Sequence, residues 1–311
     1  MIQGRGIGQH EEKPGKMVLV IGDIMLDQHI SGRIEKPEGD DLFPAISKYE
    51  DRKQLAAAAS IASKIKEMGR RVLLAGLVGR DQEGNTIKKM LKAEGIPLVL
   101  GMLSTRPTTV RKTINICDRP VLSLVDEPSQ DMKTGIFQEI IKLVTILSDD
   151  LSTIVMCDYG RGVVTCELVS AITEICSQKD IKTLVLTRKT TRERMTKYLG
   201  VELVIIKKAL LEQLHRGSPV NQDELELAVN NIIKETGCRA CLVASGAEGA
   251  YLFKNDYSFI YRPLKKLENP ALALDADELF AVCLSIGLSR KTSMEEGFKE
   301  ACRVLEEGAY N

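Results

Sequence analysis

Four short segments of the 311-residue chain combine acidic side chains with glycine or with the start of a helix. They are residues 22–27, 76–84, 157–162 and 274–278. Carboxylates accept hydrogen bonds from ligand hydroxyls and can remove a proton from them, and glycine allows the backbone to approach a ligand closely. The first three segments follow apolar runs that are typical of buried strands. Ligands of open α/β sheets bind at the carboxyl ends of strands, so these segments are candidates for a binding site.

Two of these segments have an equally plain explanation without a ligand. Asp23 and Asp27 suit a hydrogen-bonded turn or a cap as well as they suit a hydroxyl-binding pair. Asp81 is the expected N-cap of the helix that follows it, and for its segment this is the stronger interpretation.

The remaining two segments differ in how well packing alone explains them. The acids from Asp275 to Glu278 open an apolar helix, where the helix dipole favours negative charge whatever the function. Asp158 and Arg161 stand beside Gly160 and Gly162, and such a loop is hard to explain as packing.

Composition excludes several classes of protein. Hydrophobic residues make up 44% and charged residues 28%, which is ordinary for a globular protein. Lys+Arg and Asp+Glu are both 43, so the chain lacks the basic excess of a dedicated nucleic-acid binder. The longest apolar run, 279–288, is too short for a membrane span, which needs about 20 residues. Residues 1–16 are polar and lack the apolar core of a secretory signal, and we expect a disordered tail there.

The eight cysteines indicate a reducing compartment, and we expect the protein in the cytoplasm. Several cysteines lie inside apolar runs, as buried thiols do. Cys238 and Cys241 form a lone C-x-x-C, which lacks the second pair or the histidines that zinc needs. We therefore predict no metal site of the protein's own.

The order of apolar patterns predicts an α/β protein. Strands are expected at 17–21, 72–78, 108–116, 121–125, 154–157, 183–186, 203–206, 240–244, 250–253 and 259–261. Helices are expected at 54–68, 84–94, 134–147, 166–178, 275–289 and 293–307, and further helices are expected between the strand at 203–206 and residue 236. From residue 154 strands and helices alternate, which builds a doubly wound, mostly parallel sheet with helices on both faces. The segments 28–48 and 108–126 do not fit this winding and predict short antiparallel lid strands, within one domain over 17–311.

The segments described above stand in the order and spacing of a known family. From Met17 to about Ser289 the chain resembles the ribokinase-like, phosphofructokinase-B-type carbohydrate kinases. Residues 22–27, 107–111 and 158–162 are most similar to the kinase half of the bifunctional heptose-7-phosphate kinase/adenylyltransferases. The resemblance implies a ribokinase-like fold with a β-sheet lid that commonly builds a homodimer. It also implies ATP- and Mg²⁺-dependent phosphoryl transfer to a sugar or sugar-phosphate hydroxyl. From the balance of charge and the short apolar runs, we expect neither a nucleic acid nor a membrane as a partner.

The resemblance also implies roles for particular residues. Asp277 corresponds to the base of the family's G-A-G-D motif, in which the glycines let backbone amides wrap the migrating phosphoryl group. The implied substrate-binding residues are Asp23, Asp27, Asp158, Arg161 and Lys189. The implied nucleotide-binding residues are Ser245, Gly246, Gly249 and Lys207.

Several positions depart from the family's pattern at the ligand. The G-A-G-D motif becomes 274–277 without its glycines, where Leu274 and Asp275 crowd and repel a phosphate. The family's G-G-A-A-N becomes 56–60, with alanines and Ser60. The Asn and Glu of the family's metal-associated N-x-x-E pattern fall on Lys207 and Leu210. The Asp-Pro that precedes the lysine in the heptose-kinase segment becomes Thr187-Arg188, before Lys189. The Asp that precedes the G-A-G-D motif becomes Ala271.

Two hypotheses follow from these departures. One is an active sugar or sugar-phosphate kinase in which Arg188, Lys189, Lys207 and Lys208 make new phosphate contacts. The other, slightly favoured, is a catalytically impaired pseudokinase that acts as a binding or partner subunit. A dinucleotide-dependent redox protein is excluded because no G-x-G-x-x-G follows the first strand.

Overall fold

The computed structural model describes residues 16–35, 45–99, 102–103, 106–117, 119–126, 135–215, 217–219, 221–246, 249–256, 258–263 and 275–306. The expected tail, apart from Lys16, lies outside these residues, as do Ala271, Leu274 and residues 36–44 of the expected lid. Within the described ranges, no helix has both the length and the apolar composition to cross a membrane.

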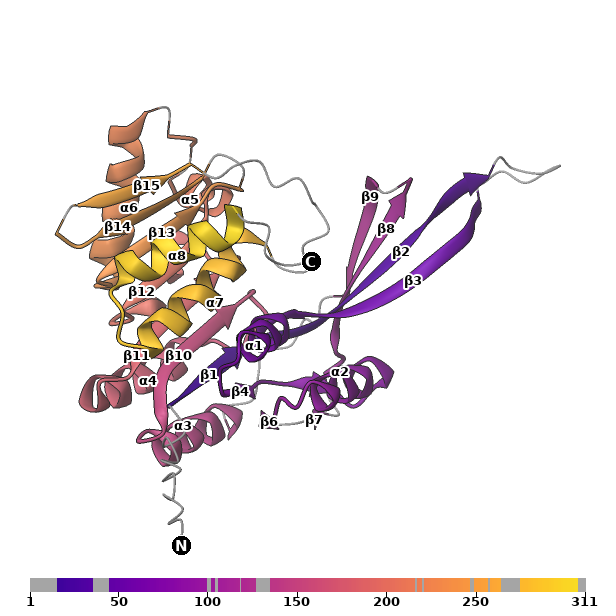
Figure 1. Ribbon diagram of the computed structural model, residues 1–311, viewed down its shortest axis with the longest axis horizontal. Coiled ribbons are helices and arrows are strands. Elements are labelled where there is room, and N and C mark those ends of the chain that lie inside the picture. Colours follow the sequence, from indigo (N-terminus) through magenta and orange to yellow (C-terminus); the bar gives the residue numbers. More distant parts are fainter. Residues whose placement is uncertain are drawn as a thin grey trace, which may run out of the picture.

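The main sheet has nine strands in the order β15-β14-β13-β12-β11-β10-β1-β4-β6 (Figure 1). The strands are β1 (Met17–Gly22), β4 (Val72–Ala75), β6 (Leu98–Val99), β10 (Leu151–Asp158), β11 (Lys182–Thr187), β12 (Leu203–Lys207), β13 (Ala240–Ala244), β14 (Ala250–Lys254) and β15 (Phe259–Arg262). All neighbours from β6 to β13 pair in parallel, and β14 and β15 add two antiparallel pairings at the edge. The predicted mostly parallel sheet is therefore confirmed.

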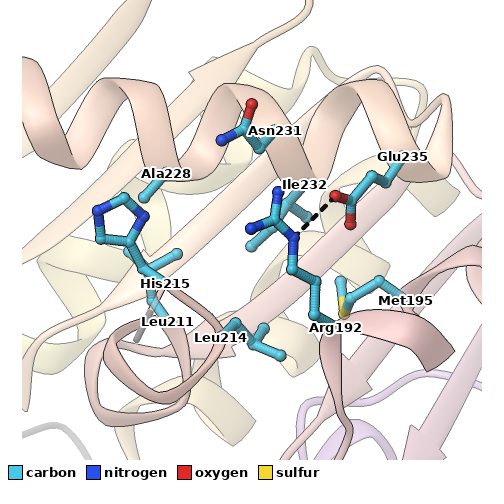
Figure 2. Close-up of a pocket in the computed structure, with 9 residues that line it drawn as sticks. All are labelled: Arg192, Met195, Leu211, Leu214, His215, Ala228, Asn231, Ile232 and Glu235. Atoms are coloured by element: carbon cyan, nitrogen blue, oxygen red, sulfur yellow. Dashed lines mark hydrogen bonds and ion pairs between the residues drawn. The ribbon is translucent and has the colours of Figure 1, made fainter. Parts of the chain in front are cut away.

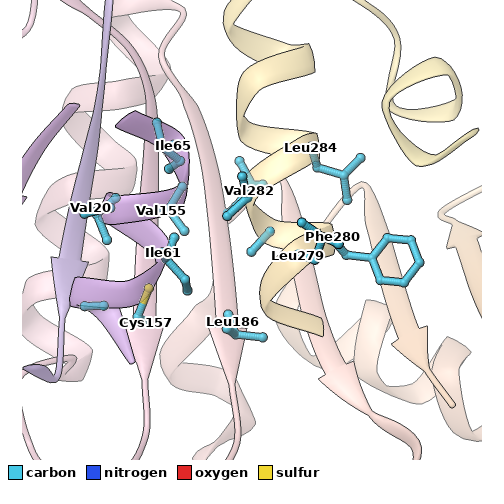
Figure 3. Packing of buried hydrophobic residues seen from close by; sticks show 14 of the residues in the cluster. Val20, Ile61, Ile65, Val155, Cys157, Leu186, Leu279, Phe280, Val282 and Leu284 are labelled. Atoms are coloured by element: carbon cyan, nitrogen blue, oxygen red, sulfur yellow. The ribbon is translucent and has the colours of Figure 1, made fainter. Parts of the chain in front are cut away.

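Helices cover both faces of this sheet. One face carries α1 (Ala58–Glu67), α2 (Gln82–Ala93), α7 (Ala276–Ser289) and α8 (Met294–Glu306). The other carries α3 (Gly135–Leu147), α4 (Cys166–Lys179), the 3₁₀ helix η1 (Arg192–Tyr198), α5 (Lys208–His215) and α6 (Gln222–Thr236). Successive strand side chains point to opposite faces, so Val20, Val155 and Leu186 pack toward α1 and α7 (Figure 3). Two apolar cores result, one on each face of the sheet, and the first of them holds α7 against the sheet.

Asp81 acts as a helix cap, as the plainer interpretation of its segment predicted. Its side chain accepts a hydrogen bond from the Gly84 amide at 2.7 Å, in the first turn of α2. It also accepts from the amide of Thr108 at 2.7 Å. Asp81 therefore ties the start of α2 to the start of a lid strand.

The lid is a separate four-stranded sheet in the order β3-β2-β8-β9 that projects from the main body (Figure 1). Its strands are β2 (Ile24–Glu35), β3 (Ala45–Ala57), β8 (Thr109–Ile116) and β9 (Arg119–Asp126). The prediction of short antiparallel strands was wrong in two respects. β2 and β3 have 12 and 13 residues, and β2 pairs with β8 in parallel.

Two predicted boundaries were also wrong. The helix expected from residue 54 begins at Ala58, because residues 54–57 continue β3 and pair with β2. Pairing across the lid thus overrides the helix preference of the alanine run. The strand expected over 72–78 is split into β4 and β5 (Val78–Gly79), and β5 pairs instead with β7 (Met102–Leu103).

Candidate functional site

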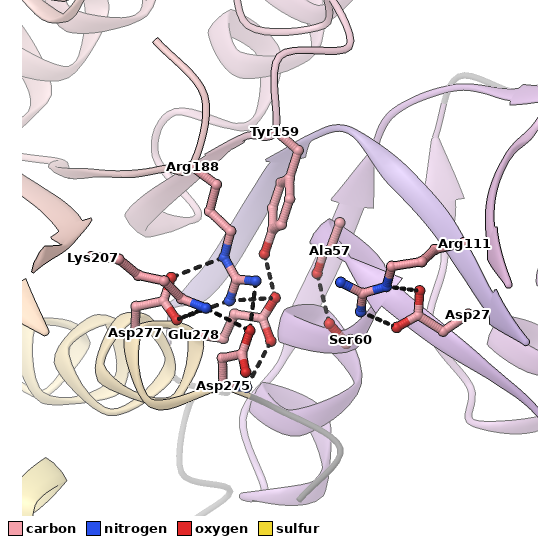
Figure 4. Close-up of polar contacts among 10 residues, drawn as sticks. All are labelled: Asp27, Ala57, Ser60, Arg111, Tyr159, Arg188, Lys207, Asp275, Asp277 and Glu278. Carbon is pink, nitrogen blue, oxygen red and sulfur yellow. Dashed lines mark hydrogen bonds and ion pairs between the residues drawn. The ribbon is translucent and has the colours of Figure 1, made fainter. Parts of the chain in front are cut away.

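Charged residues gather where the carboxyl ends of the central strands meet the first turn of α7 (Figure 4). Asp23 follows β1, Asp158 ends β10, Arg188 follows β11 and Lys207 ends β12. Since these strands are parallel, each delivers its terminal side chain to the same edge of the sheet, where ligands of such folds bind.

Arg188 holds Asp277 through both carboxylate oxygens. Nε of Arg188 donates to Oδ2 at 2.9 Å, and Nη2 donates to Oδ1 at 2.8 Å. The side chain of Asp277 is 0% exposed and that of Arg188 is 14% exposed. Nζ of Lys207 lies 3.7 Å from Oδ1 of Asp277. The carboxylate that the resemblance suggests as the base is therefore enclosed in a fork-shaped, charge-assisted pair.

Asp275 completes a second set of contacts with the same cations. Its Oδ2 lies 2.6 Å from Nη1 of Arg188 and 2.8 Å from Nζ of Lys207. Asp275 is also the N-cap residue of α7 and forms a capping box with Glu278, whose Oε2 accepts from the Asp275 amide at 3.1 Å. Although burial works in the opposite direction, Arg188 and Lys207 lower the pKa of Asp275 to about 2. Asp275 is thus ionised at neutral pH.

Glu278 is the third carboxylate around Arg188. Nη2 of Arg188 lies 3.3 Å from its Oε1, which also accepts a hydrogen bond from the hydroxyl of Tyr159. The guanidinium carbon of Arg188 stands 5.2 Å from the centre of the Tyr159 ring, within range of a cation–π contact. Burial raises the pKa of Glu278 to about 7, despite the opposing effect of Arg188. Two cations, Arg188 and Lys207, and three carboxyl groups, those of Asp275, Asp277 and Glu278, therefore form one network, the α7 network, which is buried around Asp277 and Glu278 and exposed at Asp275.

The carboxylate of Asp23 binds backbone amides of the loop that follows β10. Its carboxylate accepts hydrogen bonds from the amides of Tyr159 at 2.9 Å, Arg161 at 2.9 Å and Val163 at 3.2 Å. Burial, followed by the nearby charge of Asp158, raises the pKa of Asp23 to about 6 even though these amides lower it. In this structure Asp23 shapes the loop that follows β10.

Asp158 also makes internal contacts. It accepts from the hydroxyl of Tyr198 at 2.6 Å and from the amide of Gly160 at 2.9 Å, and it forms an ion pair with Lys197. Lys189 is exposed and lies against Gly160, whose φ of 74° and missing side chain leave room for it. Asp158 and Arg161, two of the residues implied to bind substrate, therefore lie close to Asp23.

Asp27 lies at the base of the lid and pairs with Arg111 of β8. Nε of Arg111 donates to Oδ1 of Asp27 at 3.0 Å, and Nη2 contacts Oδ2. Arg111 also interacts electrostatically with Asp275 and Arg188, so the lid and the α7 network face one another.

Ala57, where the lid joins α1, has a backbone that suits glycine. Its φ of 58° and ψ of −128° lie in a region that L-residues avoid, at a cost of about 1–3 kcal/mol. The backbone thus has the glycine-type shape that the family's pattern has there, although the residue is alanine. Ser60, where the family has asparagine, donates its hydroxyl to the carbonyl of Ala57 at 2.8 Å.

The residues implied to bind nucleotide are divided between two places. Ser245, Gly246 and Gly249 form the turn between β13 and β14, where the Ser245 amide donates to the Gly249 carbonyl at 2.9 Å. Within the described part of the chain, the buried hydroxyl of Ser245 has no hydrogen-bond partner. Lys207 instead joins Asp275 and Asp277.

Four residues of this site have no role among those that the family resemblance implied, although Arg188 was considered as a phosphate contact of an active kinase. They are Arg111, Tyr159, Arg188 and Glu278. Arg188 carried a signal, since an arginine directly after a buried strand points to the ligand edge of a parallel sheet. Glu278 was visible only as part of the acid cluster at the helix start.

Two hollows of the surface lie away from this network. One of about 20 Å³ lies among η1, α5 and α6, beside the Arg192–Glu235 ion pair (Figure 2). A more open one of about 740 Å³ is lined by Lys88, Lys89 and Lys92 of α2 above Ile96 and Pro97. Neither is lined by a residue of the α7 network, so the site is identified by its side-chain chemistry.

Comparison with known proteins agrees with the sequence resemblance. Residues 56–268 match the family described as pfkB family carbohydrate kinase. The bifunctional protein HldE of Helicobacter hepaticus is 23% identical over 246 residues, which cover 79% of this chain and 50% of that protein. HldE of a Bradyrhizobium species is 23% identical over 287 residues, or 91% of this chain and 58% of that protein. The chain therefore spans about half the length of these relatives.

Solved structures with the same fold include two sugar kinases. Phosphofructokinase-2 from Escherichia coli, in complex with substrates and products, superposes with a TM-score of 0.75 at 15% identity, covering 95% of this chain and 94% of that chain. Ribokinase from Arabidopsis thaliana, complexed with ribose and ATP, has a TM-score of 0.71 at 12% identity, covering 94% and 92%. At such low identity these likenesses show the fold.

Proposed function

From the premise that this chain belongs to the pfkB carbohydrate kinase family, we propose that it is a pseudokinase whose phosphoryl-transfer centre is closed by internal ion pairs. It would act as a binding or partner subunit of the same fold. The observation that carries this proposal is the hold of Arg188 on both oxygens of Asp277.

The proposal follows from what a general base must do. A base needs an oxygen directed at the substrate hydroxyl, within hydrogen-bond reach. Both oxygens of Asp277 already accept charge-assisted hydrogen bonds from Arg188, and its side chain is fully buried. Moving the guanidinium away would leave three carboxyl groups without their shared partner, which is costly in a buried setting.

The surroundings of Asp277 do not fit magnesium and phosphate either. Kinases of this family generally use ATP with Mg²⁺, which takes oxygen ligands. The positions of the family's metal-associated pattern hold Lys207, a cation, and Leu210, which is buried in the apolar core. Among the described residues, no group of three His, Cys, Asp or Glu side chains is arranged to hold a metal ion. The residues at these positions therefore do not fit Mg²⁺.

A second candidate is an active kinase of the heptose-7-phosphate type. The specific observation that favours it is that Asp277 keeps its place in the first turn of α7, beside two cations. If Arg188 and Lys207 moved from the carboxylates to the phosphates of a nucleotide, Asp277 would be released as a base. The substrate class of this candidate rests on the resemblance of residues 22–27, 107–111 and 158–162 to the kinase half of heptose-7-phosphate kinase/adenylyltransferases.

The deciding experiment is a turnover assay. The protein is incubated with Mg-ATP and a panel of sugars and sugar 1- and 7-phosphates, and ADP release is followed. We expect release no faster than the background, and no change in Asp277→Asn. Sugar-dependent turnover that Asp277→Asn abolishes, but that the remote charge change Asp149→Asn leaves intact, would refute the pseudokinase and establish the active kinase.

We also propose a homodimer through the lid. β9 exposes Val121, Leu122, Leu124 and Val125 on both of its faces, and it is the edge strand of its sheet. Exposed apolar edge strands favour pairing with another chain. Sedimentation velocity at micromolar concentration should show a dimer, which Leu124→Glu dissociates and Ile146→Glu, at an exposed position of α3 outside the lid, does not. A wild-type monomer across this range would contradict the proposal.

The state of the cysteines supports a reducing compartment, for which we propose the cytoplasm. All eight are free thiols, and six of them are buried. Buried thiols without disulfides are typical of proteins kept reduced.

A further inference from the structure

We propose that Asp275 is an autoinhibitory group, whose carboxylate occupies the position where Arg188 and Lys207 would otherwise receive a phosphate. Replacing Asp275 with a neutral residue should then open an anion-binding site. This inference rests on the proposed function in taking the start of α7 as the former phosphate side of a kinase.

Cations from separate elements converge on Asp275. Arg188, after β11, reaches its Oδ2 at 2.6 Å, and Lys207, at the end of β12, reaches the same oxygen at 2.8 Å. Arg111, on the lid, interacts with it electrostatically. Arginine and lysine at this spacing suit phosphate oxygens as well as they suit a carboxylate. The Asp275 carboxylate is thus in the place of an anion held by two cations of the main body, Arg188 and Lys207.

Asp275 is also the most exposed carboxylate of this network. Its side chain is 51% exposed, whereas those of Asp277 and Glu278 are 0% and 8% exposed. Asp277 is enclosed by the fork of Arg188, and Glu278 is held by Tyr159. An anion that arrives from solvent therefore meets the two cations on the side where Asp275 now binds them.

The balance of charge explains why the group inhibits. With Asp275 present, Arg188 and Lys207 face three carboxyl groups, and an incoming phosphate meets no excess of positive charge. Without it, two carboxyl groups remain, and burial raises the pKa of one of them, Glu278, to about 7. The two cations then outweigh the acids at neutral pH, and the amides of the first turn of α7 add to the attraction.

The test uses inorganic phosphate as the probe and Asp275→Ser as the variant. Serine is a good N-cap residue, so the change removes the charge and keeps the cap. The control is Asp149→Ser, which removes an exposed carboxylate that pairs with Lys179 far from the site. Calorimetric titration of the full chain should show phosphate bound at least about tenfold more tightly by Asp275→Ser than by the wild type, which equals about 1.4 kcal/mol. Asp149→Ser should bind like the wild type.

A second substitution makes the test specific. Adding Lys207→Gln to Asp275→Ser should abolish the gain, because Lys207 is one of the two proposed phosphate contacts. Phosphate binding by Asp275→Ser that is no tighter than in the wild type, or a gain that survives Lys207→Gln, would overturn the inference. If Asp275→Ser is unfolded by far-UV circular dichroism, Asp275→Asn replaces it in the same titration.

The outcome is separable from that of the proposed function. Phosphate binding needs no turnover, so the inference can fail while the wild type remains inactive. Conversely, ADP release by the wild type would refute the pseudokinase, and the phosphate titration would still test separately whether Asp275 occupies an anion-binding position.

Discussion

Replacing Arg188 with methionine should destabilise the protein far more than replacing a surface arginine. The change removes the partner of Asp277, which is 0% exposed and accepts hydrogen bonds from Arg188 at 2.9 and 2.8 Å. It also removes the contact with Asp275 at 2.6 Å. Removing one partner of a buried ion pair costs about 3–5 kcal/mol, because the other charge stays buried without compensation. Methionine keeps most of the aliphatic volume, so the loss reports charge rather than a cavity.

The assay is urea unfolding followed by far-UV circular dichroism at pH 8, since the chain contains no tryptophan for fluorescence. Arg192→Met is the matched control. Arg192 makes an ion pair with Glu235 at 3.2 Å, but its side chain is 52% exposed, and exposed pairs contribute about 0–1 kcal/mol. We therefore expect a loss of free energy of unfolding of about 3–5 kcal/mol for Arg188→Met and less than about 1 kcal/mol for the control.

A double-mutant cycle distinguishes a charge effect from simple loss of packing. Once Arg188 is methionine, Asp277→Asn should restore about 1–3 kcal/mol, because it removes the uncompensated charge. A cost for Arg188→Met no larger than that of the control, or strict additivity of the two changes, would refute the view that Arg188 neutralises Asp277.

Two further predictions concern pH and backbone strain. Glu278→Gln should keep the capping box, which accepts glutamine, and flatten the dependence of stability on pH. Burial raises the folded-state pKa of Glu278 from 4.5 to about 7, so the contribution of this group to stability is fully present below pH 4.5 and is lost as pH rises through 7. The urea midpoints of the two proteins should therefore agree near pH 4.5, and the variant should have the higher midpoint above pH 7. A constant difference between the midpoints across this range would count against the prediction. Ala57→Gly should raise the free energy of unfolding by up to about 1 kcal/mol, since it relieves a φ of 58°. Ala62→Gly, inside α1, should lower it by about 1 kcal/mol, and equal losses in both would show that Ala57 is unstrained.

The fold could be predicted well from local patterns. Runs such as Met17–Gly22 and Ala240–Ala244 are apolar throughout because both faces of a parallel sheet are buried, and helices alternate with them. The cap at Asp81 followed from its place before a helix. The predictions failed where pairing with a distant strand decided the outcome, as at residues 54–57, which continue the lid strand against β2.

The candidate site was predicted only in outline. Asp277, Asp23 and Asp158 were identified as candidates, but the partners that determine their behaviour are remote in sequence. Arg188 lies 89 residues before Asp277, and the amide of Tyr159 that binds Asp23 lies 136 residues after it.

The alternation of strands and helices, the family resemblance and the absence of glycine at 274 and 276 are all visible in the amino-acid sequence. Three features appear only once the chain is folded: Arg188 encloses Asp277, Asp23 binds the amides of a loop, and Ala57 has a backbone suited to glycine. Local patterns do not predict these features, because periodicity and capping act within a few residues. An ion pair depends instead on which strands become neighbours in the sheet and on which side chains are removed together from water.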